Sequence, residues 1–293
     1  MNQKTSPFDR FRVPPNDKVQ LKDYPTNDTA PLTDKAQAEA HLNDSREQIA
    51  ELQSKLYAQN TSGLLVVLQG IDASGKDSTI KHVMSGVNPA GVRVTSFKVP
   101  TTTELDHDYL WRYAIALPER GMIGVYNRSQ YEEVLVVRVH PELLGREHLH
   151  PTKKTAGIWP KRFRDINNFE QYLCENGFEV LKFFLHISKE EQRQRFLARI
   201  DSPKKNWKFS EGDVRERSFW DDYRKAFEEM LSNTSTKDAP WYVVPADQKW
   251  FARAVVADVI KSKLTEMNPQ YPQLDAAAQE GLKRAAALLR AEK

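Results

Sequence analysis

Short apolar segments alternate with longer amphipathic segments along most of this chain. Five apolar segments have the composition of buried strands, namely Leu64–Leu68, Val92–Phe97, Met122–Tyr126, Val180–Ile187 and Trp241–Val244. The stretches between them favour helices over Asp77–Ser85, Glu104–Leu117, Arg162–Asn176, Ser188–Ile200, Asp213–Leu231 and Gln248–Met267. Because strands alternate with helices, the sequence predicts an α/β fold built on one parallel sheet.

Local signals refine two of these elements. Thr101 with Glu104, and Ser188 with Glu191, have the spacing of capping boxes that begin helices. The apolar run Val134–Val139 fits either a helix or a short strand. We favour a helix for this run because it follows a loop at the end of a predicted strand.

The two ends of the chain differ from the middle. Residues 1–32 are polar and contain five prolines, which predicts an extended arm without a core of its own. Residues 33–60 carry leucine and isoleucine at helical spacing, and residues 271–293 are rich in Ala, Leu and Lys. The predicted organisation is an arm, a helix, a main domain over 61–270 and a C-terminal helix.

The composition of the chain limits the kinds of binding partner and the cellular compartment that we expect. The chain has 293 residues, with 43 Lys and Arg against 40 Asp and Glu, so its net charge of +3 argues against a nucleic-acid partner. Cys174 is the single cysteine, which excludes an intrachain disulfide and indicates a reducing compartment. We find no secretory signal and no apolar run of membrane-spanning length. The sequence therefore predicts a cytoplasmic protein with no membrane partner.

The segment after the first predicted strand is the most informative part of the chain. Gly70-Ile71-Asp72-Ala73-Ser74-Gly75-Lys76-Asp77-Ser78 lies between a strand and a helix, as a phosphate-binding loop must. Its glycines allow backbone N–H groups to converge on an anion, and its lysine supplies a positive charge. The predicted phosphate-binding residues are Gly70, Ala73, Ser74, Gly75, Lys76, Asp77, Ser78, Lys81 and Lys98. The alternative is an ordinary turn from strand to helix.

The loop departs from the usual motif in its acidic residues. Asp77 occupies the place where a serine or threonine hydroxyl normally binds Mg²⁺. Asp72 also puts a carboxylate among amides that face an anion, and this arrangement repels phosphate unless a divalent cation lies between them. Asp72 is therefore the first candidate for a Mg²⁺ ligand. The alternative makes it a turn residue that binds its own backbone.

A second group of polar residues follows the strand that ends at Tyr126. Asn127 stands where this sheet class usually has a carboxylate for Mg²⁺, so it can hold the metal only through water. Arg128 presents a planar set of donors that can spread charge over a transferring phosphoryl group. The alternative role for Arg128 is an ion pair with Glu132 or Glu133.

A third feature is a basic segment, here called the lid segment, over about 188–220. It holds six cations within sixteen positions, namely Arg193, Arg195, Arg199, Lys204, Lys205 and Lys208. Asp201-Ser202-Pro203 interrupts it, which gives a helix, a basic loop and a second helix, as in the lids of nucleoside monophosphate kinases. Arg199 and Asp213 are expected to organise its closed state. A solvated charged face is the alternative.

From about Leu64 to Met267 the chain resembles the polyphosphate kinase 2 family. The resemblance rests on the loop with aspartates around its Gly-Lys pair, on Tyr126–Glu132, on Asn206–Ser210, on Ala239-Pro240-Trp241 and on Ala246–Trp250. It implies a three-layer, thymidylate-kinase-like P-loop fold with a helical lid. It also implies inorganic polyphosphate as donor, Mg²⁺ (or Mn²⁺) as cofactor, and assembly into homodimers or homotetramers.

Within this family, Asn127, Glu132 and the run Val136–His140 are similar to class III, whose members phosphorylate AMP and ADP. The catalytic set that we expect is Asp72, Lys76, Asn127, Arg128 and Glu132. The predicted function is phosphoryl transfer from polyphosphate to adenine nucleotides. Two alternatives are an ATP-dependent nucleoside monophosphate kinase and a phosphate- or nucleotide-binding module without catalysis.

Overall fold

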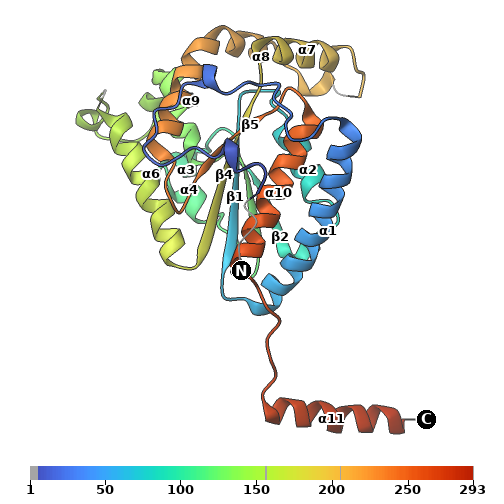
Figure 1. The fold of residues 1–293 in the computed structure, drawn as a ribbon. Helices are drawn as coiled ribbons and strands as arrows, with labels where there is room; N and C mark the ends of the chain where they lie inside the picture. Colours follow the sequence, from blue (N-terminus) through green and yellow to red (C-terminus); the bar gives the residue numbers. More distant parts are fainter. Residues whose placement is uncertain (1–5, 156, 205, 293) are drawn as a thin grey trace.

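A five-stranded parallel sheet forms the centre of the computed structural model, which describes residues 6–155, 157–204 and 206–292. The strands are β1 (Gly63–Gln69), β2 (Val92–Ser96), β3 (Ile123–Asn127), β4 (Phe178–His186) and β5 (Trp241–Pro245). Their order across the sheet is β2-β3-β1-β4-β5, and every neighbouring pair is parallel (Figure 1). All five predicted strands and the parallel α/β fold are confirmed.

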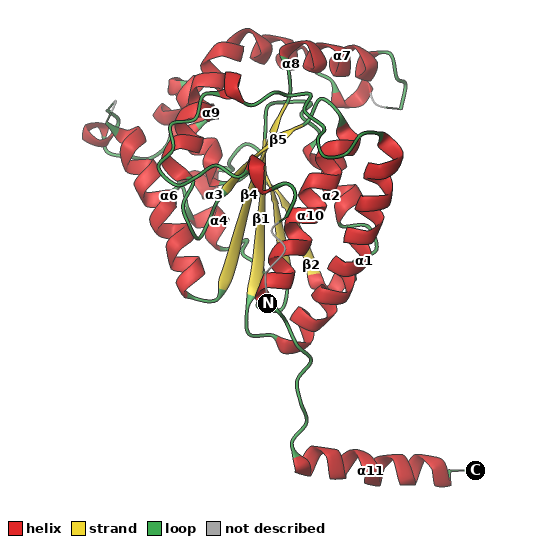
Figure 2. Cartoon of the chain, viewed as in Figure 1, coloured by secondary structure: helices red, strands yellow, loops and turns green. Residues whose placement is uncertain are grey.

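Helices cover both faces of this sheet (Figure 2). One face carries α1 (Lys35–Gln59), α2 (Lys76–Val83) and α10 (Lys249–Met267), and the other carries α6 (Ile158–Glu175) and α9 (Trp220–Thr234). Side chains of β1 alternate between the two cores, with Leu64, Val66 and Leu68 in the first and Leu65 and Val67 in the second. Burial on both faces explains why this strand is apolar throughout.

The predicted helix Glu104–Leu117 is wrong. The structure has two single-turn helices there, α3 (Thr102–Leu105) and α4 (Trp111–Ala114). Between them Asp108 Oδ1 accepts a hydrogen bond from the backbone N–H of Leu110, at 2.9 Å. This side chain takes the place of a helical carbonyl, and such local bonds compete with a continuous helix. The capping box of Thr101 and Glu104 is confirmed.

The predicted helix Asp213–Leu231 is also divided. Helix α8 (Glu211–Glu216) ends in the 3₁₀ turn Arg217–Phe219, from which α9 continues in a new direction. The guanidinium of Arg217 donates to the carbonyl of Lys189 at 2.6 Å and so ties this turn to α7 (Lys189–Ile200). A contact between segments so far apart in sequence cannot be seen in a local pattern. Helix α5 (Val136–Val139) confirms the helix favoured for the ambiguous apolar run.

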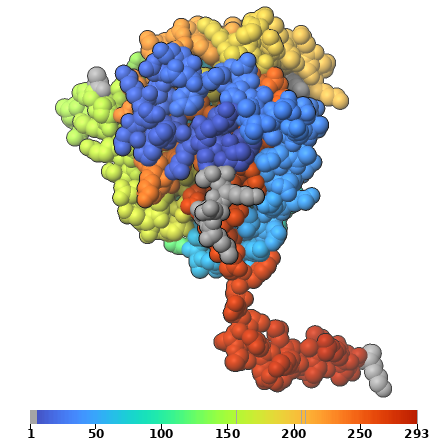
Figure 3. Space-filling view, viewed as in Figure 1, coloured from blue at the N-terminus to red at the C-terminus, as the bar shows by residue number. Residues whose placement is uncertain are grey.

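The two ends of the chain are held differently. Residues 6–32 lie against the main body and cover part of one face (Figure 3), with Phe8, Phe11 and Val13 buried. The backbone N–H of Val13 donates to the carbonyl of Trp241 at 2.8 Å, beside β5. In contrast, α11 (Ala276–Ala291) stands apart from the body and has no buried residue. In the part of the chain that the structure describes, every helix is too short or too polar to span a membrane.

Candidate active site

The loop between β1 and α2 has a conformation that its sequence permits. Gly70 has φ of +155°, and a Cβ added there would lie 2.6 Å from Ser74 Oγ and 2.9 Å from the carbonyl oxygen of Leu185. Gly75 and Ala73 also have positive φ, at 107° and 62°. The loop thus turns tightly at the carboxyl end of the sheet, and α2 begins at Lys76. This is the geometry in which backbone N–H groups can surround an anion.

Lys76 is the first residue of α2, and its buried side chain reaches back to the start of the loop. Its Nζ donates to the carbonyl of Gly70 at 2.6 Å and approaches the carbonyl of Ile71 at 3.4 Å. Burial, assisted by the positive charge of Arg128, lowers the pKa of Lys76 to about 8. The ammonium therefore loses its proton at a lower pH than an ordinary lysine, and a bound anion would stabilise its charged form.

This lowered pKa predicts a pH dependence. Below pH 8 Lys76 is charged, and above it the free enzyme loses the charge that attracts phosphate. We expect kcat/KM to fall above pH 8 by about tenfold per pH unit, since kcat/KM reports ionisations of the free enzyme. Phosphate groups have their last pKa near 6, so the substrates are already fully ionised there. In Lys76→Arg, whose guanidinium stays charged, this decline should disappear; an identical decline in that variant would contradict the assignment.

Arg128 joins the loop to the segment that follows β3. Its Nη2 lies 2.6 Å from Asp72 Oδ1, and its Nη1 lies 2.9 Å from Glu132 Oε2. The two carboxylates, Glu132 first, raise the pKa of the Arg128 guanidinium above its usual range. The alternative pairing with Glu132 is thus present, together with a contact to the phosphate-binding loop. Asp72, Arg128 and Glu132 line a cavity of about 30 Å³ with Gly70 and Gln192.

Arg128 also has an unusual backbone conformation. Its φ is +66°, in the left-handed region that a non-glycine residue seldom adopts. Strain of this kind persists only where the surrounding structure enforces it, and such residues cluster at functional sites.

Asn127 faces the second aspartate of the loop. Its side-chain amide donates to Asp77 Oδ1 at 2.6 Å and lies 3.4 Å from Ser96 Oγ of β2. The sequence grouped Asn127 with Asp72 as metal ligands and Asp77 with the phosphate-binding residues. The structure instead puts Asn127 beside Asp77. One feature of the sequence indicates that Asp77 could lie near a metal site, since it replaces the hydroxyl that usually binds Mg²⁺.

Arg195 was expected to be a lid cation, but the structure uses it to anchor the phosphate-binding loop. Its Nη1 donates to the carbonyls of Ala73 and Ser74 at 2.9 and 2.8 Å. Its Nη2 donates to those of Ala246 and Asp247 after β5, at 2.5 and 3.1 Å. These four hydrogen bonds hold the loop carbonyls and fix the loop against the segment after β5.

Gln192, which sequence analysis did not single out, has a related place. Its Nε2 donates to the carbonyl of Asp72 at 3.0 Å. Arg195 and Gln192 both lie on α7. The loop is therefore held by a helix about 120 residues further along the chain, and no local pattern reveals such a contact.

The other residues of the lid segment are more exposed. Arg199 Nη1 lies 3.5 Å from Asp213 Oδ2, so the structure brings this expected pair together. Arg193 instead pairs with Glu190 on its own helix, at 2.6 Å. Lys205 and the side chain of Lys208 lie outside the described residues. Lys81 on α2 and Lys98 after β2 are exposed.

Fold and site together define a class of protein. The site combines a buried lysine in a loop between strand and helix, an arginine that follows the neighbouring strand, and oxygen ligands around them. These are the parts of a P-loop phosphotransferase. The polyphosphate kinase 2 family model matches residues 32–272. The chain belongs to this family, which confirms the resemblance inferred from its sequence.

Individual relatives agree with this assignment. An ADP-polyphosphate phosphotransferase of Rhodopseudomonas palustris is 50% identical, covering 93% of this chain and 95% of the relative. An AMP/ADP-polyphosphate phosphotransferase of Meiothermus ruber is 44% identical, covering 92% and 98%. The crystal structure of polyphosphate kinase 2 from Arthrobacter aurescens TC1 superposes with a TM-score of 0.86 at 38% identity, covering 97% and 99%. The fold is thus that of a P-loop kinase of this family.

Proposed function

We propose that this chain transfers the terminal phosphoryl group of inorganic polyphosphate to AMP and to ADP, forming ADP and ATP. The observation that carries the proposal is the charge cluster at the loop: Arg128 and Asp72 are paired and line one cavity, and the buried ammonium of Lys76 interacts electrostatically with both. The names of both relatives support polyphosphate as donor and ADP as acceptor, and the name of the Meiothermus ruber relative also supports AMP; each aligns over more than nine-tenths of this chain.

The residues act mainly by alignment and by charge. Phosphoryl transfer passes through a loose transition state, so a protein contributes positioned donors and little covalent chemistry. Lys76 binds the donor phosphates within the loop. Arg128 stabilises negative charge on the moving phosphoryl group, and Glu132 holds its guanidinium in place. Asp72 orients the accepting oxygen, and the Arg199–Asp213 pair organises the closed lid segment.

The donor set fits Mg²⁺ or Mn²⁺. Among the described residues no three His, Cys, Asp or Glu side chains form a complete metal site. Asp72 and Asp77 nevertheless offer carboxylate oxygens from either end of the loop, which suits a cation that binds one or two carboxylates plus substrate phosphates. Asn127 would add a bond to metal-bound water. When bound, the metal would neutralise charge on the phosphates.

The neutral side chain of Asn127 explains how one site can accept both AMP and ADP. AMP and ADP end in phosphates at different distances from the base, so the accepting oxygen must meet the donor from two positions. In Asn127→Asp, a carboxylate would replace the amide that lies 2.6 Å from Asp77, and metal binding would tighten.

We expect Asn127→Asp to lower kcat/KM for AMP more than for ADP by a factor on the order of ten, or roughly 1.4 kcal/mol of barrier. Asn127→Ala, which adds no charge, is the matched control and should affect both acceptors alike. Steady-state kinetics with each acceptor decide the matter. Equal losses on AMP and ADP in Asn127→Asp would show that this residue does not set the acceptor range.

Donor identity is tested by supplying polyphosphate or ATP separately. With AMP and Mg²⁺, the chain should form ADP from polyphosphate alone and should be slow with ATP as the only donor. Efficient transfer from ATP but none from polyphosphate would identify a conventional nucleoside monophosphate kinase. Tight polyphosphate binding without turnover would identify a binding module.

Assembly into a homodimer or homotetramer belongs to this proposal. Helix α11 exposes Leu282, Leu288 and Leu289, and an isolated helix of its length is marginally stable in water. A second copy of the chain would cover this apolar face. Light scattering should report two or four chains for the full protein, and fewer for one that ends at Gln273. A monomeric full-length protein would contradict the proposal. A cytoplasmic location also belongs to this proposal, since adenine nucleotides are the proposed acceptors.

A further inference from the structure

A buried ion pair lies behind the catalytic segment. Glu170 of α6 and Lys182 of β4 are both fully buried, and Lys182 Nζ lies 2.5 Å from Glu170 Oε2. Lys182 Nζ also donates to the Tyr131 hydroxyl at 2.8 Å and to the carbonyl of Thr234 at 2.7 Å. The three N–H bonds of the ammonium therefore each have an acceptor. Its charge also lies 5.3 Å from the ring centres of Tyr131 and Trp241.

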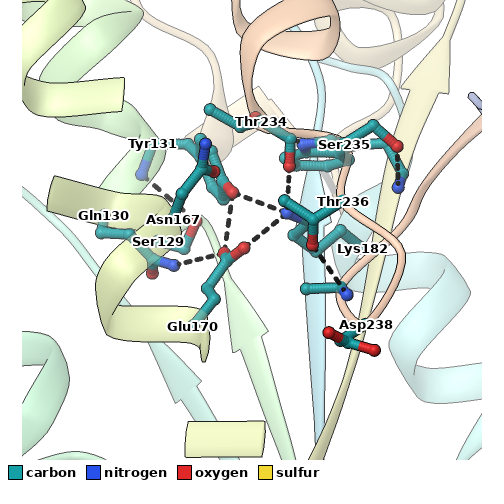
Figure 4. Close-up of polar contacts among 12 residues, drawn as sticks. Ser129, Gln130, Tyr131, Asn167, Glu170, Lys182, Thr234, Ser235, Thr236 and Asp238 are labelled. Atoms are coloured by element: carbon teal, nitrogen blue, oxygen red, sulfur yellow. Dashed lines mark hydrogen bonds and ion pairs between the residues drawn. The ribbon is translucent and has the colours of Figure 1, made fainter. Parts of the chain in front are cut away.

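The carboxylate of Glu170 is equally occupied, and its partners come from the segment after β3. Its Oε1 accepts from the Tyr131 hydroxyl at 2.7 Å and from the Gln130 amide at 3.0 Å. Figure 4 shows Gln130 and Tyr131, from the segment after β3, and Lys182, from β4, converging on Glu170. Each polar atom of the pair is thus satisfied, and within the network only the Gln130 Oε1 atom is buried without a hydrogen-bond partner among the described residues.

The same segment is tied to the end of β1, immediately before the phosphate-binding loop. Gln69, the last residue of β1, donates from its side chain to Ser129 Oγ at 3.1 Å. Ser129, Gln130 and Tyr131 are all fully buried. They are also the three residues between Arg128 and Glu132, whose side chains reach into the site. Every residue of this connection is therefore held by a buried polar partner.

Stability alone does not explain such a pair. Burying two charges costs desolvation, and replacing a buried ion pair with apolar side chains of similar size is often neutral or stabilising. On this face of β4 the neighbours of Lys182 are Val180 and Phe184, which belong to an apolar core. A geometric role for the pair is the simpler explanation.

We propose that Glu170 and Lys182 are positioning residues that hold the segment 129–131, and through it the guanidinium of Arg128, in the geometry required for phosphoryl transfer. Both side chains are buried, and neither lines the cavity formed by Asp72, Arg128 and Glu132. The pair fixes the backbone that carries Arg128 in its left-handed conformation and keeps that guanidinium between Asp72 and Glu132. The inference rests on the proposed function for its kinetic test.

The test is a double-mutant cycle with Arg128. In the wild-type background Arg128→Ala should lower kcat at least about a hundredfold. The variant Glu170→Leu/Lys182→Met replaces the pair with apolar side chains. It should remain folded, because the relief from burying two charges offsets part of the loss of partners for Gln130, Tyr131 and Thr234, and it should lower kcat by about tenfold or more with a smaller change in KM. In that background Arg128→Ala should cost no more than about tenfold, because the guanidinium is already misplaced.

A buried carboxylate remote from this segment provides the control. Asp258 of α10 binds Ser6 at 2.5 Å, His41 at 2.9 Å and Lys261 at 2.5 Å. Asp258→Asn should lower Tm while leaving the full cost of Arg128→Ala intact. If the apolar pair fails to fold, Tyr131→Phe removes one hydroxyl from the network and is placed in the same cycle.

Additive losses between either network variant and Arg128→Ala would overturn the inference. A crystal structure of the network variant gives a readout that does not depend on turnover. Arg128 should have left its contacts with Asp72 and Glu132, and unchanged contacts would also overturn the inference. Failure of the proposed function would instead appear as a wild-type protein without polyphosphate-dependent turnover.

Discussion

Lys76→Ala should lower kcat/KM for polyphosphate-dependent phosphorylation by about a hundredfold or more. The ammonium is buried in the loop and hydrogen-bonded to the carbonyl of Gly70, so no solvent cation can take its place. Removing a preorganised group that stabilises developing charge typically costs a factor of this order.

The measurement for Lys76→Ala is initial-rate kinetics with polyphosphate as donor and with AMP or ADP as acceptor. Lys55→Ala on α1 is the matched control, because it removes a half-buried lysine that pairs with the exposed Glu51, away from the loop. The control should keep its rate within about twofold, since surface pairs contribute little. Near-normal turnover in Lys76→Ala would show that the loop does not bind the reacting phosphates.

Arg128→Ala is the second substitution for which we expect a large loss of activity. It removes the guanidinium and leaves the carboxylates of Asp72 and Glu132 facing the site without their cation. We expect kcat to fall by about a hundredfold or more, and KM for polyphosphate to rise because the uncovered carboxylates repel phosphate. Arg128→Lys should recover only part of the rate, since a lysine cannot contact both carboxylates with a planar group.

Arg138→Ala serves as the control for Arg128. This arginine lies ten positions later and pairs with Glu229 at 2.6 Å. Its loss should leave kcat nearly unchanged. Comparable losses in Arg128→Ala and Arg138→Ala would mean that positive charge in this region acts without regard to geometry.

Local patterns were sufficient for much of the fold. The strands were predictable because each is a short apolar run bounded by polar residues, as in Leu64–Leu68. The loop was predictable because glycine spacing and Lys76 are chemical requirements of phosphate binding. The helix over 104–117 was not, because the Asp108 side chain competes with the backbone. Arg217 shows the second limit, since its contact with the carbonyl of Lys189 is made across the fold.

The site was predictable to the extent that its chemistry is local. Asp72, Lys76, Arg128 and Glu132 were identified as site residues and do lie together. Arg195 was identified by its charge, but its contacts could not be predicted, because its partners are carbonyls about 120 residues away.

The Glu170–Lys182 pair was not anticipated. Lys182 lies in an apolar run that was predicted as a strand, and no neighbouring residue in the sequence indicates that Glu170 is its partner. Only folding shows that the two charges meet under the segment that carries Arg128.

The most direct test of the central claim is a time course with AMP as the only acceptor and polyphosphate as the only donor, analysed by nucleotide chromatography. In the presence of Mg²⁺, AMP should decline, ADP should rise and then fall, and ATP should accumulate. Lys76→Ala, purified in the same way, should form neither product within the same period. If the wild-type protein leaves AMP unchanged, or stops at ADP while polyphosphate remains, phosphoryl transfer to both acceptors by this site is contradicted.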